Sequence, residues 1–273
     1  MSIGASDLKL SRYLASGMKK VPGLVRPGGF PLILAIDQAQ KAAGIRGHVG
    51  EIGVLFGKLF ILLYLLRRED ERAVAVDDFS EVASQEQFLR HLDGQVGDRR
   101  ALRLLRADSR RLSAGDLTSA AGGRFRLFSI DGNHAADAVE HDLRIVCGAL
   151  SPAGVIALDD YFAEDWPGVS EATCRFLATG QGGELVPFAI GANKLFLCPS
   201  ASAPTYLHHL AAMDADASRY EREFFGHRVV CYNFAPHNIL GVNVSRKWAN
   251  TPAWRALKEH PLGHYIRFRL RRP

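Results

Sequence analysis

Short apolar runs and longer amphipathic stretches follow one another along the middle of the chain. The apolar runs are bounded by Gly, Pro or charged residues, which is the pattern of strands buried on both faces of a sheet. The stretches between them repeat apolar residues at helical spacing. We predict a helix that runs from the end of the apolar run Gly50–Val54 to Leu66, and further helices over Glu81–Leu92 and Ala135–Leu150. The predicted strands are Gly50–Val54 with its turn, Ala73–Asp77, Leu102–Leu105, Arg126–Asp131 and Val155–Asp159.

This alternation of strand and helix predicts an α/β protein. Two further runs, Leu185–Ile190 and Lys194–Cys198, are joined by the short turn Gly191–Asn193. Strands joined so closely are typical of an antiparallel pair. We therefore expect a Rossmann-like, mostly parallel sheet of seven strands, with helices on both faces and an antiparallel closing strand.

The flanks of this core differ from it in pattern. Residues 1–44 are punctuated by Pro and Gly and contain a predicted helix over Leu32–Ala43, so we expect an entry or lid segment there. Residues 45–199 would form the ligand-binding domain, and residues 200–273 a C-terminal extension that packs on it or forms a homo-oligomer contact. The elements predicted in the extension are a helix at about Pro204–Phe224, a strand at His227–Tyr232 and a short helix near Pro252–Glu259.

Composition narrows the class of protein. The chain is 47% hydrophobic and 23% charged, which is enough apolar sequence for a substantial core and argues against disorder. The net charge of +5 comes from scattered arginine doublets such as Arg67-Arg68 and Arg99-Arg100, and no basic stripe is interleaved with aromatic residues. We therefore expect no nucleic-acid partner.

Cysteine usage and hydropathy favour a cytoplasmic protein with no membrane segment. Cys147, Cys174, Cys198 and Cys231 lie far apart and form no CxxC pair, so neither a zinc site nor a disulfide framework is indicated. The N-terminus lacks the apolar core of a signal peptide. The most apolar run, Val54–Leu66, is too short to span a bilayer and is predicted to be a buried helix.

Acidic residues end several of the predicted strands. Asp77, Asp131 and Asp159 each follow an apolar run. Because ligands of open α/β sheets bind outside the carboxyl ends of the strands, these side chains are predicted to converge on one crevice.

The turn after the first strand indicates the kind of ligand. A dinucleotide site needs small residues where the pyrophosphate approaches the backbone, whereas bulky Leu55 and Phe56 fill this turn. S-adenosylmethionine has no phosphate, and its ammonium and sulfonium groups favour acidic partners. Glu51 is placed either to face the ammonium or to hold the loop, and Gly53 and Gly57 would let the backbone pass close to the ligand.

The next acidic residues extend the predicted cofactor site. Asp77 ends the second strand, where a carboxylate can accept both ribose hydroxyls, with Asp78 as the alternative. Asp108 and Ser109 follow the third strand and are placed to meet the adenine. The alternative is structural, with packing glycines in the turn and Asp77 and Asp108 as helix caps. An NAD(P) oxidoreductase is also left open.

A second acidic group points to metal-assisted chemistry. Asp131, Asp159 and Asp160 would crowd one rim, where carboxylates repel one another unless a cation neutralises them. Their oxygens suit Mg²⁺ or Mn²⁺. His134 follows closely enough to remove a proton from a substrate hydroxyl. The alternative is a set of caps and loop hydrogen bonds in which His134 stabilises the turn.

These features resemble the Rossmann-fold class of S-adenosylmethionine methyltransferases. Within that class the chain is similar to the metal-dependent small-molecule O-methyltransferases of the macrocin and mycinamicin type, which act on sugar hydroxyls of natural products. In the predicted helix Ala135–Leu150, which follows the IDG-x-H motif, Glu140 and Asp142 are expected on the solvated face. The matching stretches are Glu51–Lys58, Ala75–Phe79, Ile130–Leu143 and Gly154–Phe162, with weaker similarity at Pro167–Val169 and Asn193–Leu195.

The resemblance implies a role for each motif residue. Asp131 would bind the metal, Asp159 and Asp160 would complete the ligand set, and His134 would be the base. Asp77 would hold the ribose.

The expected activity is transfer of a methyl group from S-adenosylmethionine to a hydroxyl of a small molecule, assisted by Mg²⁺. Asn133 replaces the Asp that is common at this position in the wider family, and residues 1–44 and 200–273 match nothing recognisable. Two alternatives stay open: a binding protein that keeps the fold without catalysis, and the NAD(P) oxidoreductase.

Overall fold

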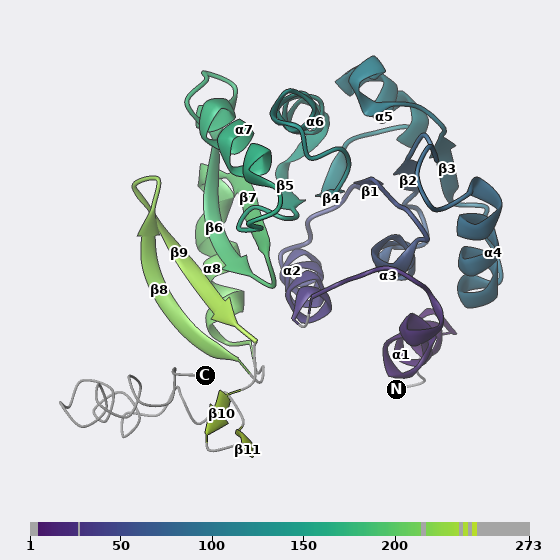
Figure 1. Ribbon diagram of the computed structural model, residues 1–273, viewed down its shortest axis with the longest axis horizontal. Helices are drawn as coiled ribbons and strands as arrows, with labels where there is room; N and C mark the ends of the chain where they lie inside the picture. The colour runs from purple at the N-terminus through teal and green to yellow at the C-terminus, as the bar shows by residue number, and fades with distance from the viewer. Residues whose placement is uncertain (1–4, 27, 214–216, 235–236, 240–241, 245–273) are drawn as a thin grey trace.

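The computed structural model describes residues 5–26, 28–213, 217–234, 237–239 and 242–244. One nine-stranded sheet runs through this part of the chain (Figure 1). Its strands are β1 (His48–Ile52), β2 (Ala73–Val76), β3 (Leu102–Leu105), β4 (Phe125–Ile130), β5 (Leu150–Leu158), β6 (Leu185–Gly191), β7 (Lys194–Pro199), β8 (Ser218–Phe224) and β9 (His227–Asn233). Two short strands, β10 (His237–Ile239) and β11 (Val242–Val244), form a separate antiparallel pair.

The strand order is β3-β2-β1-β4-β5-β7-β6-β9-β8. Strands β1 to β5 pair in parallel, as the alternating pattern predicts. β7 pairs antiparallel with both β5 and β6, so the predicted closing pair is confirmed. The reversal of chain order beside β1, where β4 replaces the next sequential strand, marks the place where an open α/β sheet binds its ligand.

The prediction of seven strands is wrong, because β8 and β9 extend the sheet beyond β6. The predicted helix Pro204–Phe224 ends at Ala211, and its second half is strand β8. A tight turn at Phe225 and Gly226, both with positive φ, pairs β8 with β9. β8 has charged residues on a largely exposed surface, as an edge strand does, and this hides the strand pattern.

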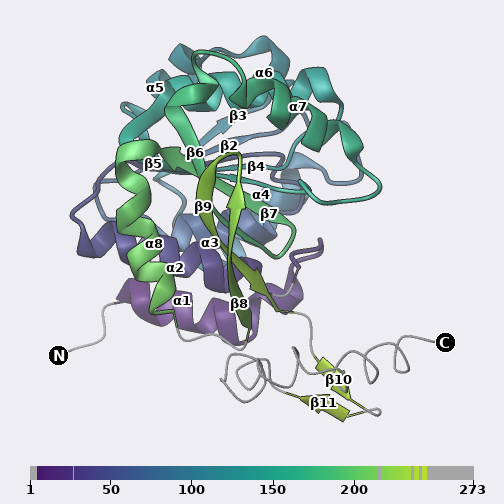
Figure 2. The same ribbon diagram turned by 90° about the vertical axis from the view of Figure 1, so that its left-hand side faces the viewer.

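Helices cover both faces of the sheet (Figure 2). The described helices are α1 (Ala5–Ala15), α2 (Gly29–Ala42), α3 (Lys58–Leu66), α4 (Gln85–Val96), α5 (Ala114–Ala121), α6 (Ala136–Ala149), α7 (Pro167–Leu177) and α8 (Ala203–Ala211). Helices α1 to α4 and α8 pack on one face of the sheet, and α5, α6 and α7 pack on the other.

The helices predicted over Leu32–Ala43, through Leu66, over Glu81–Leu92 and over Ala135–Leu150 are present with shifted ends, as α2, α3, α4 and α6. Helices α1, α5 and α7 were not predicted. The apolar helix α3 is buried along almost its whole length, which agrees with the prediction of a core helix. None of the described helices is long and apolar enough to cross a bilayer. The helix predicted near Pro252–Glu259 lies outside the described residues.

A buried charge network joins α2 to β4 away from the strand ends that carry the acidic residues. The guanidinium of Arg126, which is 0% exposed, lies 2.9 Å from Asp37 Oδ1 and 2.9 Å from Glu71 Oε1. It also donates to Gln40 Oε1 at 2.6 Å and to the carbonyl of Leu66. Because every charge in this network has a partner, the network supports the fold without needing a ligand.

Replacing Arg126 with Met should lower the free energy of unfolding by about 3–5 kcal/mol, since Asp37 and Glu71 would lose the fully buried cation that they share and keep only Lys41 and Arg68 as charged partners. Urea unfolding followed by circular dichroism measures this loss. The control is Arg100→Met, because Arg100 is 92% exposed in its pair with Asp98 and its loss should change stability by about 0–1 kcal/mol. Equal losses in the two variants would contradict the assigned role of Arg126.

Candidate active site

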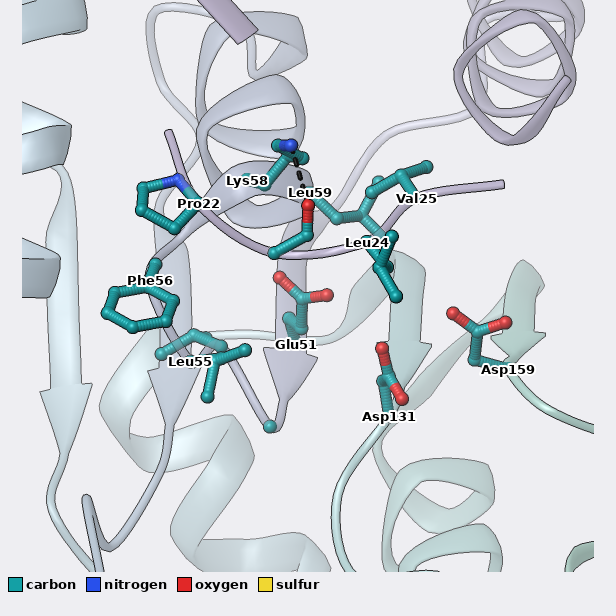
Figure 3. Close-up of a pocket in the computed structure, with 13 residues that line it drawn as sticks. Pro22, Leu24, Val25, Glu51, Leu55, Phe56, Lys58, Leu59, Asp131 and Asp159 are labelled. Atoms are coloured by element: carbon teal, nitrogen blue, oxygen red, sulfur yellow. Dashed lines mark hydrogen bonds between the residues drawn. The ribbon is translucent and has the colours of Figure 1, made fainter. Parts of the chain in front are cut away.

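Two carboxylates lie side by side at the carboxyl ends of β4 and β5. The backbone N–H of Asp131 donates to the carbonyl of Ile52 at 2.9 Å, and that of Asp159 donates to the carbonyl of Ile130 at 2.9 Å. The strand ladders thus continue one residue past β4 and β5. Figure 3 shows both side chains beside Glu51 from β1. The predicted convergence of Asp131 and Asp159 at one sheet edge is therefore what the structure shows.

Gly53 allows the turn after β1 to approach the end of β4. Its φ is +83°, and a Cβ at this position would lie 1.8 Å from the carbonyl oxygen of Asp131. Gly57 caps the start of α3 with a φ of +92°, and the ring of Phe88 lies 3.0 Å from where its Cβ would be. The fold itself therefore requires Gly53, so the packing alternative accounts for this glycine. Contact of either glycine with a cofactor stays a prediction.

Glu51 is a buried carboxyl group with one oxygen that lacks a hydrogen-bond donor among the described residues. It is 2% exposed, and its Oε2 has no hydrogen-bond partner among the described residues. Burial raises the pKa of Glu51 well above its ordinary value, and the nearby charge of Asp131 raises it further. An unpaired buried carboxylate is costly, so a cationic donor at this position would stabilise it.

A cavity opens beside Glu51 at this edge of the sheet (Figure 3). Its volume is about 350 Å³, including the part open to solvent. Glu51, Asp131 and Asp159 give it an acidic wall. The lining residues are Pro22, Gly23, Leu24, Val25, Glu51, Gly53, Val54, Leu55, Phe56, Lys58, Leu59, Asp131 and Asp159.

The segment 22–25 crosses this cavity (Figure 3). Lys58 Nζ donates to the carbonyl of Gly23 at 2.6 Å and so ties the segment to the start of α3. Leu24 lines the cavity although it is 97% exposed. Part of the predicted entry segment thus lies over the site, and its action as a lid stays a prediction.

Asp77 is hydrogen-bonded to the turn that lines the cavity and is not itself among the described residues that line it. Its Oδ2 accepts from the backbone N–H of Leu55 at 2.9 Å, and its Oδ1 accepts from that of Phe79 at 2.7 Å. Burial raises the pKa of Asp77, although these two hydrogen bonds lower it. A carboxylate has further lone pairs for ribose hydroxyls.

The residues predicted to meet adenine lie outside the cavity wall. Asp108 accepts from the backbone N–H of Arg110 at 3.0 Å and so caps the short turn Ser109–Arg111, which is the capping alternative. Ser109 is buried. Neither Asp108 nor Ser109 is among the described residues that line the cavity, so their contact with adenine stays a prediction.

His134 is held between two carboxylates. Its Nε2 lies 3.1 Å from Asp160 Oδ2 and 3.6 Å from Asp131 Oδ1, and the ring stacks on Trp166 at 4.4 Å between centroids. The nearby carboxylates of Asp131 and Asp160 raise the pKa of His134 to about 9. Ligand atoms of Asp131, His134 and Asp160 all lie within 4.8 Å of one another. Two carboxylates and an imidazole at this spacing suit a small divalent cation.

Asp159, the third predicted metal ligand, has other partners. Its Oδ1 accepts from the backbone N–H of Asp160 at 2.9 Å, and its Oδ2 pairs with Nζ of Lys194. Asp160 in turn accepts from Asn193 through Oδ1. The adjacent carboxylates point to different partners because Asp160 has a left-handed backbone, with a φ of +56°.

Asn193 and Lys194 are functional candidates that the sequence did not reveal. The only signal available was their weak similarity to the family at the start of the predicted strand. Their contact with Asp159 and Asp160 depends on the antiparallel register of β5 and β7, in which Leu158 pairs with Leu195. A pattern within one strand does not specify that register.

Asp142 was expected on a solvated helix face, and this prediction is wrong. It is 0% exposed, because the turn Ser109–Arg111 packs on α6, and neither carboxylate oxygen has a hydrogen-bond partner among the described residues. Burial raises the pKa of Asp142 to about 6, although the nearby Ser109 hydroxyl lowers it.

Comparison with known proteins places these residues in a family. A family model described as a methyltransferase domain matches residues 51–161, which run from Glu51 on β1 to Tyr161 beyond β5. The chain carries a methyltransferase domain. The domain is of the Rossmann-fold, S-adenosylmethionine-dependent class, and the protein is accordingly an enzyme. No curated protein matches the chain.

Solved structures share the fold of this methyltransferase. The O-methyltransferase NovP matches with a TM-score of 0.58 and 14% sequence identity, covering 71% of this chain and 99% of NovP. Cofactor-bound Rv0187 from MTB matches with a TM-score of 0.50 and 17% identity, covering 71% of this chain and 89% of that protein. The long coverage at low identity shows a common fold.

The buried Asp142 gives the methyltransferase a pH-dependent stability. A rise of its pKa from 3.8 to about 6 means that the folded protein holds the proton more tightly than the unfolded chain. The free energy of unfolding should therefore fall as the pH rises from about 4 to about 6, by on the order of 3 kcal/mol. Asp142→Asn should remove this fall and be more stable than wild type at pH 7.5 but not at pH 4.

Urea unfolding at several pH values measures the effect. Asp137→Asn is the matched control, because Asp137 is exposed on the first turn of the same helix and its loss should change stability by less than about 1 kcal/mol. Parallel pH profiles for wild type and Asp142→Asn would contradict the assignment.

Proposed function

We propose that this methyltransferase transfers the methyl group of S-adenosylmethionine to a hydroxyl of a small molecule, with help from Mg²⁺ or Mn²⁺. The observation that carries the proposal is the position of His134 Nε2 between Asp131 and Asp160, next to an acidic cavity. That arrangement would offer a cation site and, once a cation offsets the two carboxylates, a base beside the expected methyl donor.

The cavity wall fits the charge of the cofactor. Oε2 of Glu51 would accept a hydrogen bond from the α-ammonium, and Asp77 would accept the ribose hydroxyls. Gly53 and Gly57 would let the turn approach the ligand, and Asp108 with Ser109 would meet the adenine. The carboxylates of Glu51, Asp131 and Asp159 outnumber the buried ammonium of Lys194, which favours a positively charged ligand.

The metal would be held chiefly by Asp131 and Asp160. When bound, it would bind the acceptor oxygen and lower the pKa of the hydroxyl. Its charge would also offset the two carboxylates that raise the pKa of His134. Neutral His134 could then accept a proton at neutral pH.

His134 would remove the hydroxyl proton at Nε2 while Trp166 keeps the imidazole ring in place by stacking. The acceptor oxygen forms a bond to the methyl carbon as the bond from carbon to sulfur breaks, which leaves neutral S-adenosylhomocysteine. Alignment of oxygen, carbon and sulfur supplies much of the rate enhancement. The resemblance to macrocin-type enzymes supports a sugar or polyhydroxylated natural product as acceptor.

Cofactor binding tests the first part of the proposal. Wild type should bind S-adenosylmethionine in isothermal titration calorimetry, and Asp77→Asn should bind it roughly tenfold more weakly, because a charge-assisted hydrogen bond to ribose is lost. Asp78→Asn should bind like wild type, since Asp78 accepts hydrogen bonds from Ser80. If only Asp78→Asn bound the cofactor more weakly, Asp78 and not Asp77 would be the residue that binds the ribose. If wild type released or absorbed no heat on titration with S-adenosylmethionine, the methyltransferase assignment would be contradicted.

Turnover tests the chemical part. Release of S-adenosylhomocysteine would be measured over a panel of sugar nucleotides, glycosides and phenols with Mg²⁺. His134→Ala should lower the rate by about 10²–10⁴-fold without weakening cofactor binding. Asp160→Asn should likewise lower the rate without weakening cofactor binding. Asp165→Asn, at an exposed residue of the same loop, is the control and should turn over at the wild-type rate. Full activity in EDTA would remove the metal from the mechanism.

A further inference from the structure

Lys194 is a buried cation inside the acidic wall of the site. It begins β7, is 1% exposed, and its ammonium pairs with Asp159 Oδ2. Ala192 and Asn193 adopt positive φ in the two-residue turn before it, which sets the register of β7 against β6. On its other side β7 pairs with β5, the strand that Asp159 follows. The carboxylates of Asp131 and Glu51 also lie close enough to favour the charged form of Lys194.

Both oxygens of Asp159 are already engaged. Oδ2 accepts from Lys194, and Oδ1 accepts from the backbone N–H of Asp160. Asp160, by contrast, presents Oδ2 toward His134 and Asp131, within the group of ligand atoms that lie 4.8 Å or less apart. The neighbouring carboxylates therefore differ in their availability to a cation.

We propose that Lys194 keeps Asp159 out of the cation site, so that a divalent ion is held by Asp131 and Asp160, with His134 beside them. An ion that recruited Asp159 would have to displace an ammonium that is buried and would lose its closest partner, which is strongly unfavourable. Mg²⁺ commonly uses one or two carboxylates and fills its other positions with water or substrate oxygens. Lys194 would thus leave coordination positions open for the acceptor.

This inference rests on the metal in the proposed function, and Mn²⁺ binding to the metal-free protein tests it directly. Electron paramagnetic resonance measures free Mn²⁺ during titration, with no acceptor present. The decisive variant is Asp159→Asn/Lys194→Met, which removes both charges of the pair and leaves neither alone. It should bind Mn²⁺ within about threefold of wild type, whereas Asp160→Asn should bind at least tenfold more weakly.

Lys194→Met alone gives a second arm. It should bind Mn²⁺ severalfold more tightly than wild type, because Asp159 becomes available as a third carboxylate. Lys20→Met, at an exposed lysine, is the matched control and should bind like wild type. If Lys194→Met does not fold, the double variant decides by itself.

The outcomes separate this inference from the proposed function. A double variant that loses Mn²⁺ as severely as Asp160→Asn would show that Asp159 is a ligand in the wild-type protein and would overturn the role of Lys194. Absence of Mn²⁺ binding by wild type and by Lys194→Met would reject the metal altogether, and this inference with it. Calorimetry with S-adenosylmethionine on the same samples would show whether the methyltransferase assignment survives.

Discussion

The concentration of carboxylates at one sheet edge is the constraint on which this site depends. Parallel pairing places buried Glu51 and half-buried Asp131 and Asp159 around one cavity, where their charges repel one another. The ammonium of Lys194 offsets part of that charge from within the fold. The remaining negative charge makes the cavity suited to a cationic methyl donor, whose donor groups could bind the unpaired oxygen of Glu51.

The charge network around Arg126 and the one at the cavity differ in how completely their charged groups are paired within the protein. Arg126 is surrounded by Asp37, Glu71 and Gln40, and its guanidinium is satisfied from within the chain. The network at the cavity leaves acceptors free. A satisfied network stabilises a fold, whereas an incompletely satisfied one stores unfavourable energy that a ligand can relieve.

Segments outside the matched methyltransferase domain complete its site. The match ends at residue 161, yet Lys194 and Asn193 from the start of β7 hold the acidic pair after β5. On the other side of the cavity, residues 22–25 cross over from the N-terminal part and are tied to Lys58. Such additions change the surroundings of a common cofactor site without altering the sheet that positions it.

The sequence by itself determined the parallel core and the acidic strand ends, because doubly buried strands need continuous apolar runs and parallel strands end at one edge. Edge strand β8 was missed, since exposed charges hide its pattern. Tertiary structure alone decided that Asp142 is covered and that Asp159 meets Lys194. Burial depends on what packs against a helix, and an ion pair between strands depends on their register. Neither is contained in the pattern of one element.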